Sequence, residues 1–182
     1  MEIKCIFVSE NPPSPGALYS MQYDNATVTE YARIMQHWQD HNALSDFFKD
    51  HISDLESGFW GDIIAEEAVF NTKQEAIQFE EVLQVCCEDS RYELQHIFQP
   101  LYNSEYRLNP LQKSKEKIPR SWLRIYALRL DSNCFVITGG TIKLTLNMRP
   151  WHLQEELRKL ERAKIFLQAN DIYYSEDLKE IL

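Results

Sequence analysis

Hydrophobic and polar residues follow two different periods along the first half of the chain. Residues 3–8 and 17–23 are rich in β-forming side chains and are separated by a Pro- and Gly-containing break, so they predict two strands. Between residues 27 and 88, hydrophobic side chains recur three and four positions apart, which is the spacing of amphipathic helices. Thr72 and Glu75 have capping-box spacing and predict that one of these helices starts there. We expect the apolar stripes of these helices to form the core.

The pattern changes at residue 108. Residues 111–120 form a polar stretch that predicts a loop with four cations. Three β-rich runs follow it, at 122–130, 134–138 and 141–146. The turn between the first two is Asp131-Ser132-Asn133, and Gly139-Gly140 predicts the second turn, because the favoured two-residue hairpin needs positive φ at both positions. Together these runs predict a three-stranded antiparallel meander over 121–146.

A last helix is predicted after Pro150. Its apolar positions recur at helical spacing, at Leu153, Leu157, Leu160, Ala163 and Leu167. A helix of this length can cross one face of the sheet. The fold class predicted from these elements is α+β: a small, mostly antiparallel sheet packed with amphipathic helices.

The length of 182 residues predicts a single domain, 1–182, but charge divides it into three parts. An acidic strand and helix part, 1–107, has 6 Lys+Arg against 19 Asp+Glu. The basic meander-plus-helix module, 108–168, has 12 against 5, and the acidic tail, 169–182, has 1 against 4. This segregation suggests two faces with different partners. The alternative is that the acids only decorate the solvated faces of long helices.

Several classes of protein are not indicated. No run approaches the roughly 20 apolar residues of a membrane span, and no targeting signal opens the chain, so we expect a cytoplasmic protein without a membrane partner. The cysteines then predict reduced thiols, with Cys5, Cys86 and Cys134 as small core residues. His37 and His41 are four residues apart but lack the Glu of an H-E-x-x-H motif. We therefore predict no metal site, and no cofactor motif is present.

Candidate chemistry lies on the first strand of the meander. Its period of two puts Leu123, Ile125 and Ala127 on one side and Trp122, Arg124 and Tyr126 on the other. If Lys143 of the third strand points the same way, one open face combines cations with aromatic rings. Such a face suits single-stranded RNA, because aromatic rings stack on bases and cations hold phosphates. The alternative is an ordinary solvated face.

The run RSWLRIYALRLDSNCFVITGGTIKLT, residues 120–145, resembles the core of the RelE/HigB toxin superfamily of type II toxin–antitoxin pairs. The resemblance extends over 111–168 and rests on an Arg-bearing strand, a short turn, an apolar strand and a Lys-containing third strand. It implies a RelE-like core to which residues 1–107 add an acidic helical elaboration. Trp151 and His152 lie in the region where such sites often carry a final Tyr or His, without a firm match.

The resemblance also implies a function. These toxins are metal-free endoribonucleases that cleave mRNA, usually on the ribosome, through attack of the RNA 2′-hydroxyl, and a co-expressed antitoxin keeps them silent. Arg124 would clamp phosphate, and Lys143 would be a second strand-borne cation. The predicted catalytic residues are therefore Arg124, Lys143, Lys115 and Tyr126. The predicted RNA-binding residues are Lys113, Lys117, Arg120 and Trp122.

Two other functions are compatible with the sequence. In one, the same fold is a non-catalytic interaction module that binds a helix-turn-helix protein or another basic partner through the acidic half. In the other, the chain binds RNA without cleaving it. The expected partners are thus a cognate antitoxin, mRNA or the ribosome, and a second copy of the chain in a homodimer.

Overall fold

A computed structural model describes residues 1–8, 16–89, 91–101, 110–116 and 121–178. In chain order the elements are β1 (Glu2–Val8), β2 (Ala17–Gln22), α1 (Glu30–Gln39), α2 (His41–Asp50), α3 (Ile52–Leu55), α4 (Ala65–Glu88), α5 (Leu94–Ile97), β3 (Phe98–Pro100), β4 (Gln112–Glu116), β5 (Leu123–Asp131), β6 (Cys134–Ile142), α6 (Trp151–Ala169) and α7 (Ser175–Leu178). The two N-terminal strands and the last helix lie where the sequence predicts them.

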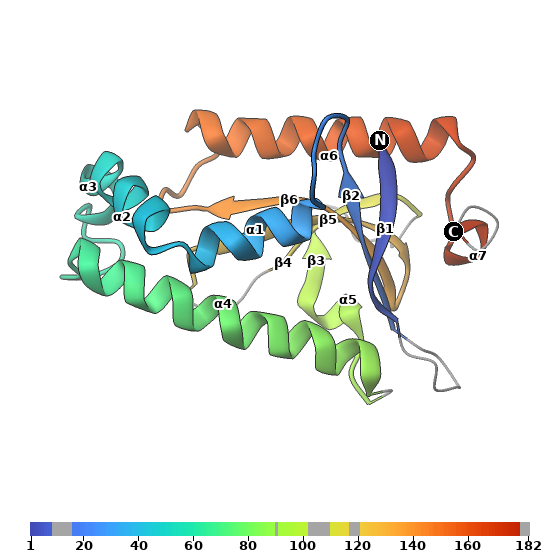
Figure 1. Cartoon of the computed structure of the whole chain (residues 1–182), viewed down its shortest axis with the longest axis horizontal. Helices are drawn as coiled ribbons and strands as arrows, with labels where there is room; N and C mark the ends of the chain where they lie inside the picture. Colours follow the sequence, from blue (N-terminus) through green and yellow to red (C-terminus); the bar gives the residue numbers. More distant parts are fainter. Residues whose placement is uncertain (9–15, 90, 102–109, 117–120, 179–182) are drawn as a thin grey trace.

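The strands form one six-stranded mixed sheet in the order β1-β2-β6-β5-β4-β3. β2 pairs with β6 in parallel, and the other four pairings are antiparallel. Helices α1 and α4 cover one face of this sheet and α6 crosses the other (Figure 1). The α+β class predicted from the sequence is confirmed.

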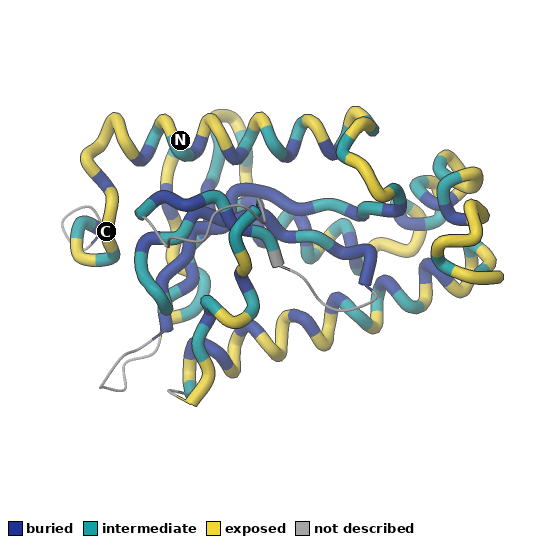
Figure 2. Tube along the Cα trace, turned by 180° about the vertical axis from the view of Figure 1, so that it is seen from behind, coloured by how far each residue is buried: buried dark blue, intermediate teal, exposed yellow. Residues whose placement is uncertain are grey.

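A hydrophobic core lies on each side of the sheet. The first contains Leu123, Ile125 and Ala127 of β5 together with the inner faces of α1, α2 and α4. The second contains Tyr126 and Leu128 of β5 beneath α6. Buried and exposed positions accordingly alternate along α4 and α6, while β5 and β6 are mostly buried (Figure 2). The side of β5 predicted to be open is therefore covered by α6: Tyr126, Leu128 and Leu130 on this side are buried, and Arg124 is partly exposed.

The predicted meander over 121–146 is wrong in its second turn. Gly139 and Gly140 lie inside β6, which continues to Ile142 and pairs with β5 through Tyr126↔Gly139 and Ile125↔Gly140. Residues 143–146 belong to no strand. The consecutive antiparallel strands are instead β4, β5 and β6, with β4 in the segment predicted as a loop.

Close packing, not a turn, explains the two glycines. A Cβ on Gly139 would lie 1.9 Å from Oε2 of Glu156 on α6. A Cβ on Gly140 would lie 2.8 Å from the backbone oxygen of Arg124 on β5 and 2.8 Å from Cδ1 of Ile34 on α1. The absence of both side chains lets a helix approach β6 from each face of the sheet.

A buried ion cluster joins α1 to α6 beyond the end of β2. Glu30 Oε2 is 2.8 Å from Nη2 of Arg33 and 3.0 Å from Nζ of Lys159, and Lys159 Nζ is also 2.9 Å from Glu156 Oε1. Both carboxylates are almost fully buried. Burial raises the pKa of Glu156, although the charges of Lys159 and Arg33 oppose this effect. The cluster connects two helices that lie on opposite faces of the sheet.

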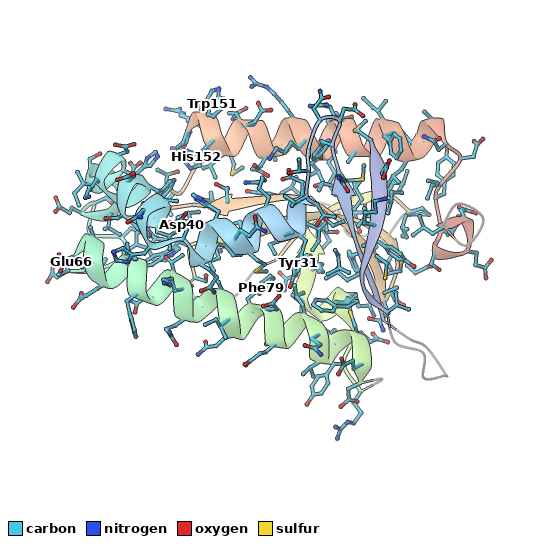
Figure 3. All side chains as sticks on the ribbon, in the orientation of Figure 1. Tyr31, Asp40, Glu66, Phe79, Trp151 and His152 are labelled. Atoms are coloured by element: carbon cyan, nitrogen blue, oxygen red, sulfur yellow. The ribbon has the colours of Figure 1, made fainter. Side chains whose placement is uncertain are left out.

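Helix α4 begins at Ala65, so the helix start predicted at Thr72 is wrong. Thr72 is buried in the middle of the helix, where its hydroxyl donates to Ala68 O at 2.7 Å. Phe79, further along the same helix, lies on the side of α4 that faces the sheet (Figure 3). The capping-box spacing of Thr72 and Glu75 therefore occurs inside a continuous helix and marks no helix start.

Two further predictions concern the burial of the cysteines and the absence of a membrane-spanning helix. Cys86, Cys87 and Cys134 are buried, but Cys5 is exposed on β1, so its assignment to the core is wrong. Within the described segments, no helix combines the length and the apolar character that crossing a membrane would need.

Candidate functional site

The candidate site lies where β5 begins and β6 ends. Arg124 of β5 pairs with Thr141 of β6, and the backbone amide of Lys143 donates to Trp122 O at 2.7 Å. Lys115 of β4 pairs with Tyr126 of β5 in the next antiparallel ladder. Strand pairing thus brings together side chains that are separated by up to 28 positions in the sequence.

The four residues predicted to be catalytic line one pocket of about 380 Å³, which we call the cationic pocket. Lys115, Arg124, Tyr126 and Lys143 supply its polar groups. Its remaining lining is apolar: Leu101, Leu146, Met148 and Leu157. A pocket of this size with three cations suits a small anion or one phosphate group of a larger ligand.

Backbone carbonyls hold the cations in place. Arg124 Nη1 donates to Ser121 O at 2.8 Å, and Lys143 Nζ donates to Leu146 O at 3.1 Å. Lys115 Nζ donates to Leu101 O, also at 3.1 Å. In the part of the chain that the structure describes, neither Arg124 nor Lys143 pairs with a carboxylate within 4.0 Å. Backbone carbonyls therefore orient the positive charge at these two positions, and no carboxylate of the described residues forms a direct ion pair with it.

The protonation of two pocket residues is shifted. Partial burial lowers the pKa of Lys143, and the neighbouring positive charges of Arg124 and Lys115 lower it further. Burial raises the pKa of Tyr126, whose hydroxyl is 3.9 Å from Met148 Sδ. A larger fraction of Lys143 is therefore neutral, and able to accept a proton, than of an ordinary lysine at the same pH, whereas the tyrosine stays protonated and can donate a hydrogen bond.

A second pocket of about 800 Å³ adjoins the first, and we call it the aromatic pocket. Arg124, Lys143 and Leu146 line both pockets. The rest of its lining comes from the segment between α3 and α4, from α4, from the residues just before β5 and from the segment after β6: Gly58, Phe59, Trp60, Gly61, Ile63, Asn71, Glu75, Ser121, Trp122 and Thr145. The two cations therefore lie between a cationic and an aromatic hollow.

Glu75 is the acidic group of the aromatic pocket. Its Oε2 accepts a hydrogen bond of 2.6 Å from the Ser121 hydroxyl. Burial raises the pKa of Glu75, while the Ser121 hydrogen bond and the charge of Arg124 oppose the increase. The aromatic pocket thus contains a partly buried carboxyl from α4 as well as the Arg124 guanidinium from β5.

No protein-family model, curated protein or solved structure matches the chain. The resemblance to the RelE/HigB superfamily therefore stays a prediction, and the geometry of the two pockets carries the functional argument.

The predicted RNA-binding residues do not lie together in the structure. Lys113 forms an ion pair with Glu161 of α6 and lines neither pocket. Trp122 was expected beside Arg124, but it is buried against α4, where its indole N–H donates to Thr72 Oγ1 at 2.9 Å. Trp122 nevertheless lines the aromatic pocket. Lys117 and Arg120 lie outside the described residues.

His152 does not complete the site. It lies in the first turn of α6 on the side of α2 and α3, next to the exposed Trp151 (Figure 3). Its Nε2 is 3.1 Å from Ile142 O, and its ring is 4.9 Å from that of His51. Burial lowers its pKa, and His51 adds to the effect. A packing role explains these contacts. Among the described residues, no group of His, Cys, Asp or Glu side chains could hold a metal ion.

Sequence reasoning missed the aromatic pocket. Phe59 and Trp60 lie between Gly58 and Gly61, both of which have φ of 83°. A pair of aromatic residues flanked by glycines is the available signal, because glycines at positive φ indicate a turn, and Phe59 in this turn is exposed. Glu75 carried no comparable signal, since its role depends on how α4 packs beside β5.

Proposed function

We propose that the chain is a metal-free endoribonuclease of the RelE/HigB type, which binds a phosphate of mRNA in the cationic pocket. One observation carries the proposal: Lys115, Arg124, Tyr126 and Lys143 line a single pocket. Phosphates are the anions best matched by an arginine fork next to lysine charges.

The reaction needs a base, a charge clamp and an acid. Lys143, whose pKa is lowered, takes the proton from the RNA 2′-hydroxyl as the 2′-oxygen attacks phosphorus. Arg124 and the Tyr126 hydroxyl donate hydrogen bonds to the developing negative charge on the phosphate oxygens. The Lys115 ammonium gives its proton to the departing 5′-oxygen. The products are a 2′,3′-cyclic phosphate and a 5′-hydroxyl end.

Control in the cell would then come from a cognate antitoxin of the helix-turn-helix class that covers the cationic pocket. Such a partner would have to present acidic groups to Arg124 and Lys143, because these two cations have no carboxylate partner within the described chain. A homodimer is compatible with this arrangement as long as the pocket stays accessible to RNA.

The experiment is cleavage of a labelled single-stranded RNA by the purified protein, with ribosomes present and absent. We expect Arg124→Ala and Lys143→Ala each to lower the cleavage rate by about 100-fold or more. Arg158→Ala is the matched control, because Arg158 is an exposed cation of α6 that pairs with Glu155. A substrate with a single 2′-deoxy sugar at the cut site should resist cleavage.

Induced expression supplies a second measurement. Wild type should arrest growth, and Arg124→Ala should relieve the arrest while accumulating to the same level. If wild-type protein cuts no RNA and is as harmless as the variant, the enzymatic proposal fails.

The outer face of α4 favours a second candidate function, an interaction module. Phe70, Ile77 and Val85 are 63%, 43% and 45% exposed, and their spacings of seven and eight residues place them on one side of the helix. Glutamates surround this stripe: Glu66, Glu67, Glu80, Glu81 and Glu88. An apolar stripe bordered by acids fits a basic partner, which we propose to be a helix-turn-helix protein.

Co-expression with the product of a neighbouring reading frame of this class tests the second function. We expect Phe70→Asp and Ile77→Asp to abolish co-purification, because each places a charge in the centre of the apolar stripe. Arg124→Ala should leave the complex intact. A complex that survives both aspartate variants would exclude this face of α4 as the interface.

A further inference from the structure

We propose that the aromatic pocket is a guanine-binding subsite, which takes the base of the nucleotide whose phosphate lies at Arg124 and Lys143. This inference rests on the proposed function for the position of the phosphate. It adds a base preference that the cationic pocket alone does not provide.

The first support is continuity between the two pockets. Arg124 and Lys143 line both of them, so a phosphate between the two cations has the aromatic pocket directly beside it. The volume of about 800 Å³ lies within the range of pockets that bind small organic ligands. A nucleotide can therefore place its base in one pocket while its phosphate contacts the cations.

The second support is an exposed aromatic ring on a fixed neighbour. Phe59 is 57% exposed, and its ring lies 4.9 Å from that of Trp60. Trp60 is held by a hydrogen bond from its indole N–H to Leu144 O at 2.8 Å, and it packs edge-on against Trp122 at 5.2 Å. The Phe59 ring thus faces solvent and is supported by the fixed Trp60 ring. An exposed, supported aromatic ring of this kind can stack on a nucleobase.

The third support is the chemistry of α4. Asn71 and Glu75 are four residues apart on this helix and both line the pocket. Oε2 of Glu75 accepts from Ser121, and a carboxylate has further acceptor sites on both oxygens. Two neighbouring acceptors match a ligand edge with two neighbouring donors. Among the four RNA bases, guanine has such an edge, formed by N1–H and the N2 amino group.

The other bases fit this carboxylate less well. Adenine and cytosine place a ring acceptor beside their amino group, and uracil places a carbonyl on each side of its N3–H. Each of them would set an acceptor against a carboxylate oxygen, which costs affinity. The Asn71 amide can donate to O6 of guanine, next to N1–H. The side chains of α4 therefore complement guanine along its whole Watson–Crick edge.

The test is a fluorescence titration of the intact chain with the four nucleoside 3′-monophosphates, in which Trp60 and Trp122 report on the pocket. We expect guanosine monophosphate to bind about tenfold more tightly than each of the other three. Phe59→Ala should weaken all four nucleotides by about tenfold through loss of stacking. Tyr174→Ala is the control, because Tyr174 is a similarly exposed aromatic residue, at 52%, and lines neither pocket.

Glu75→Gln examines base preference separately. It keeps the size of the side chain but replaces one acceptor with a donor, so the advantage of guanine should fall by about tenfold while the affinity for the other bases stays close to wild type. Equal affinity for all four bases in the wild type, or an unchanged preference in Glu75→Gln, overturns the guanine subsite.

Pyrophosphate titration keeps the two proposals apart. Binding of pyrophosphate that is lost in Arg124→Ala, with no gain in affinity from any base, would overturn the subsite and leave the phosphate site in place. A preference for guanine that persists in Arg124→Ala, with no binding of pyrophosphate, would support the base pocket and overturn the proposed phosphate site.

Discussion

The guanidinium of Arg124 lies close enough to the amine of Lys143 to lower its pKa, and both side chains line the same two pockets. Arg124 is the second residue of β5, and Lys143 directly follows the last residue of β6 and donates its backbone N–H to Trp122 O, so backbone pairing sets their proximity. Their closeness gives the site both its positive charge and its lysine base.

The effect of Arg124 on Lys143 can be measured directly. Arg124→Ala should raise the pKa of Lys143 toward the ordinary lysine value, because it removes one of the charges that disfavour the protonated amine. The sign follows from repulsion between like charges: the variant protonates more readily, and its neutral fraction at a given pH falls. An NMR titration of the lysine side-chain carbons reports this shift. An unchanged Lys143 titration in Arg124→Ala, with Arg158→Ala as reference, would contradict the proposed geometry.

The affinity for single-stranded RNA should depend on salt in proportion to the number of phosphate contacts. If three cations contact phosphates, the slope of log K against log salt is about −2, since each contact contributes about −0.7 on single strands. Lys143→Ala should reduce the magnitude of the slope by about 0.7. Lys113→Ala should not change it, because Lys113 already pairs with Glu161 and lines neither pocket. A slope near zero in the wild type would exclude phosphate binding at this site.

Trp122 is expected to contribute to stability rather than to RNA binding. Trp122→Phe removes the hydrogen bond to Thr72 and should lower the free energy of unfolding by about 1–2 kcal/mol, because the partner hydroxyl is buried. Urea denaturation measures this loss. RNA affinity should stay within about twofold of wild type. A large loss of affinity without a loss of stability would restore the RNA-binding role that the sequence predicted.

The contact between Gly139 and Glu156 predicts a specific rescue. Gly139→Ala should lower the free energy of unfolding by about 2 kcal/mol or more, because the new methyl group would displace the Glu156 carboxylate, which is buried and paired with Lys159. In a Glu156→Ala background the same change should cost less than about 1 kcal/mol, since the obstructing group is absent. The four stabilities form a double-mutant cycle. Additive losses would show that Gly139 is required for another reason.

The local hydrophobic pattern predicts an element correctly where burial of one strand face or one helix stripe determines its secondary structure. The helix after Pro150 could be predicted because it buries a regular stripe of side chains. The strands near residues 3–8 and 17–23 could be predicted from their β-forming residues on either side of a Pro- and Gly-containing break. The separation of Leu123, Ile125 and Ala127 from Tyr126 is also confirmed, because the period of a strand is two.

The local pattern does not predict features that depend on packing against an element far away in the sequence. Gly139 and Gly140 satisfy the chemistry of a turn as well as that of a close helix–strand contact, and only the positions of α1 and α6 distinguish the two. In the same way, strand period separates the two sides of β5, but it does not say that α6 covers one of them. Phe59 and Glu75 enter the site from segments about 50 to 65 positions away from Arg124, which no spacing rule connects to it.

Side chains, including Arg33 of the ion cluster, cover an edge of β6 that has no neighbouring strand among the described residues. β6 extends beyond the last residue that pairs with β2, which leaves the carbonyls of Thr138 and Gly140 without a strand partner on that side. The Tyr23 hydroxyl donates to the first at 2.8 Å, and Arg33 donates to the second at 3.3 Å. Side chains thus occupy acceptors that a β-strand of another chain would otherwise use. This part of the sheet is thereby protected from intermolecular strand addition, the first step of β-type aggregation.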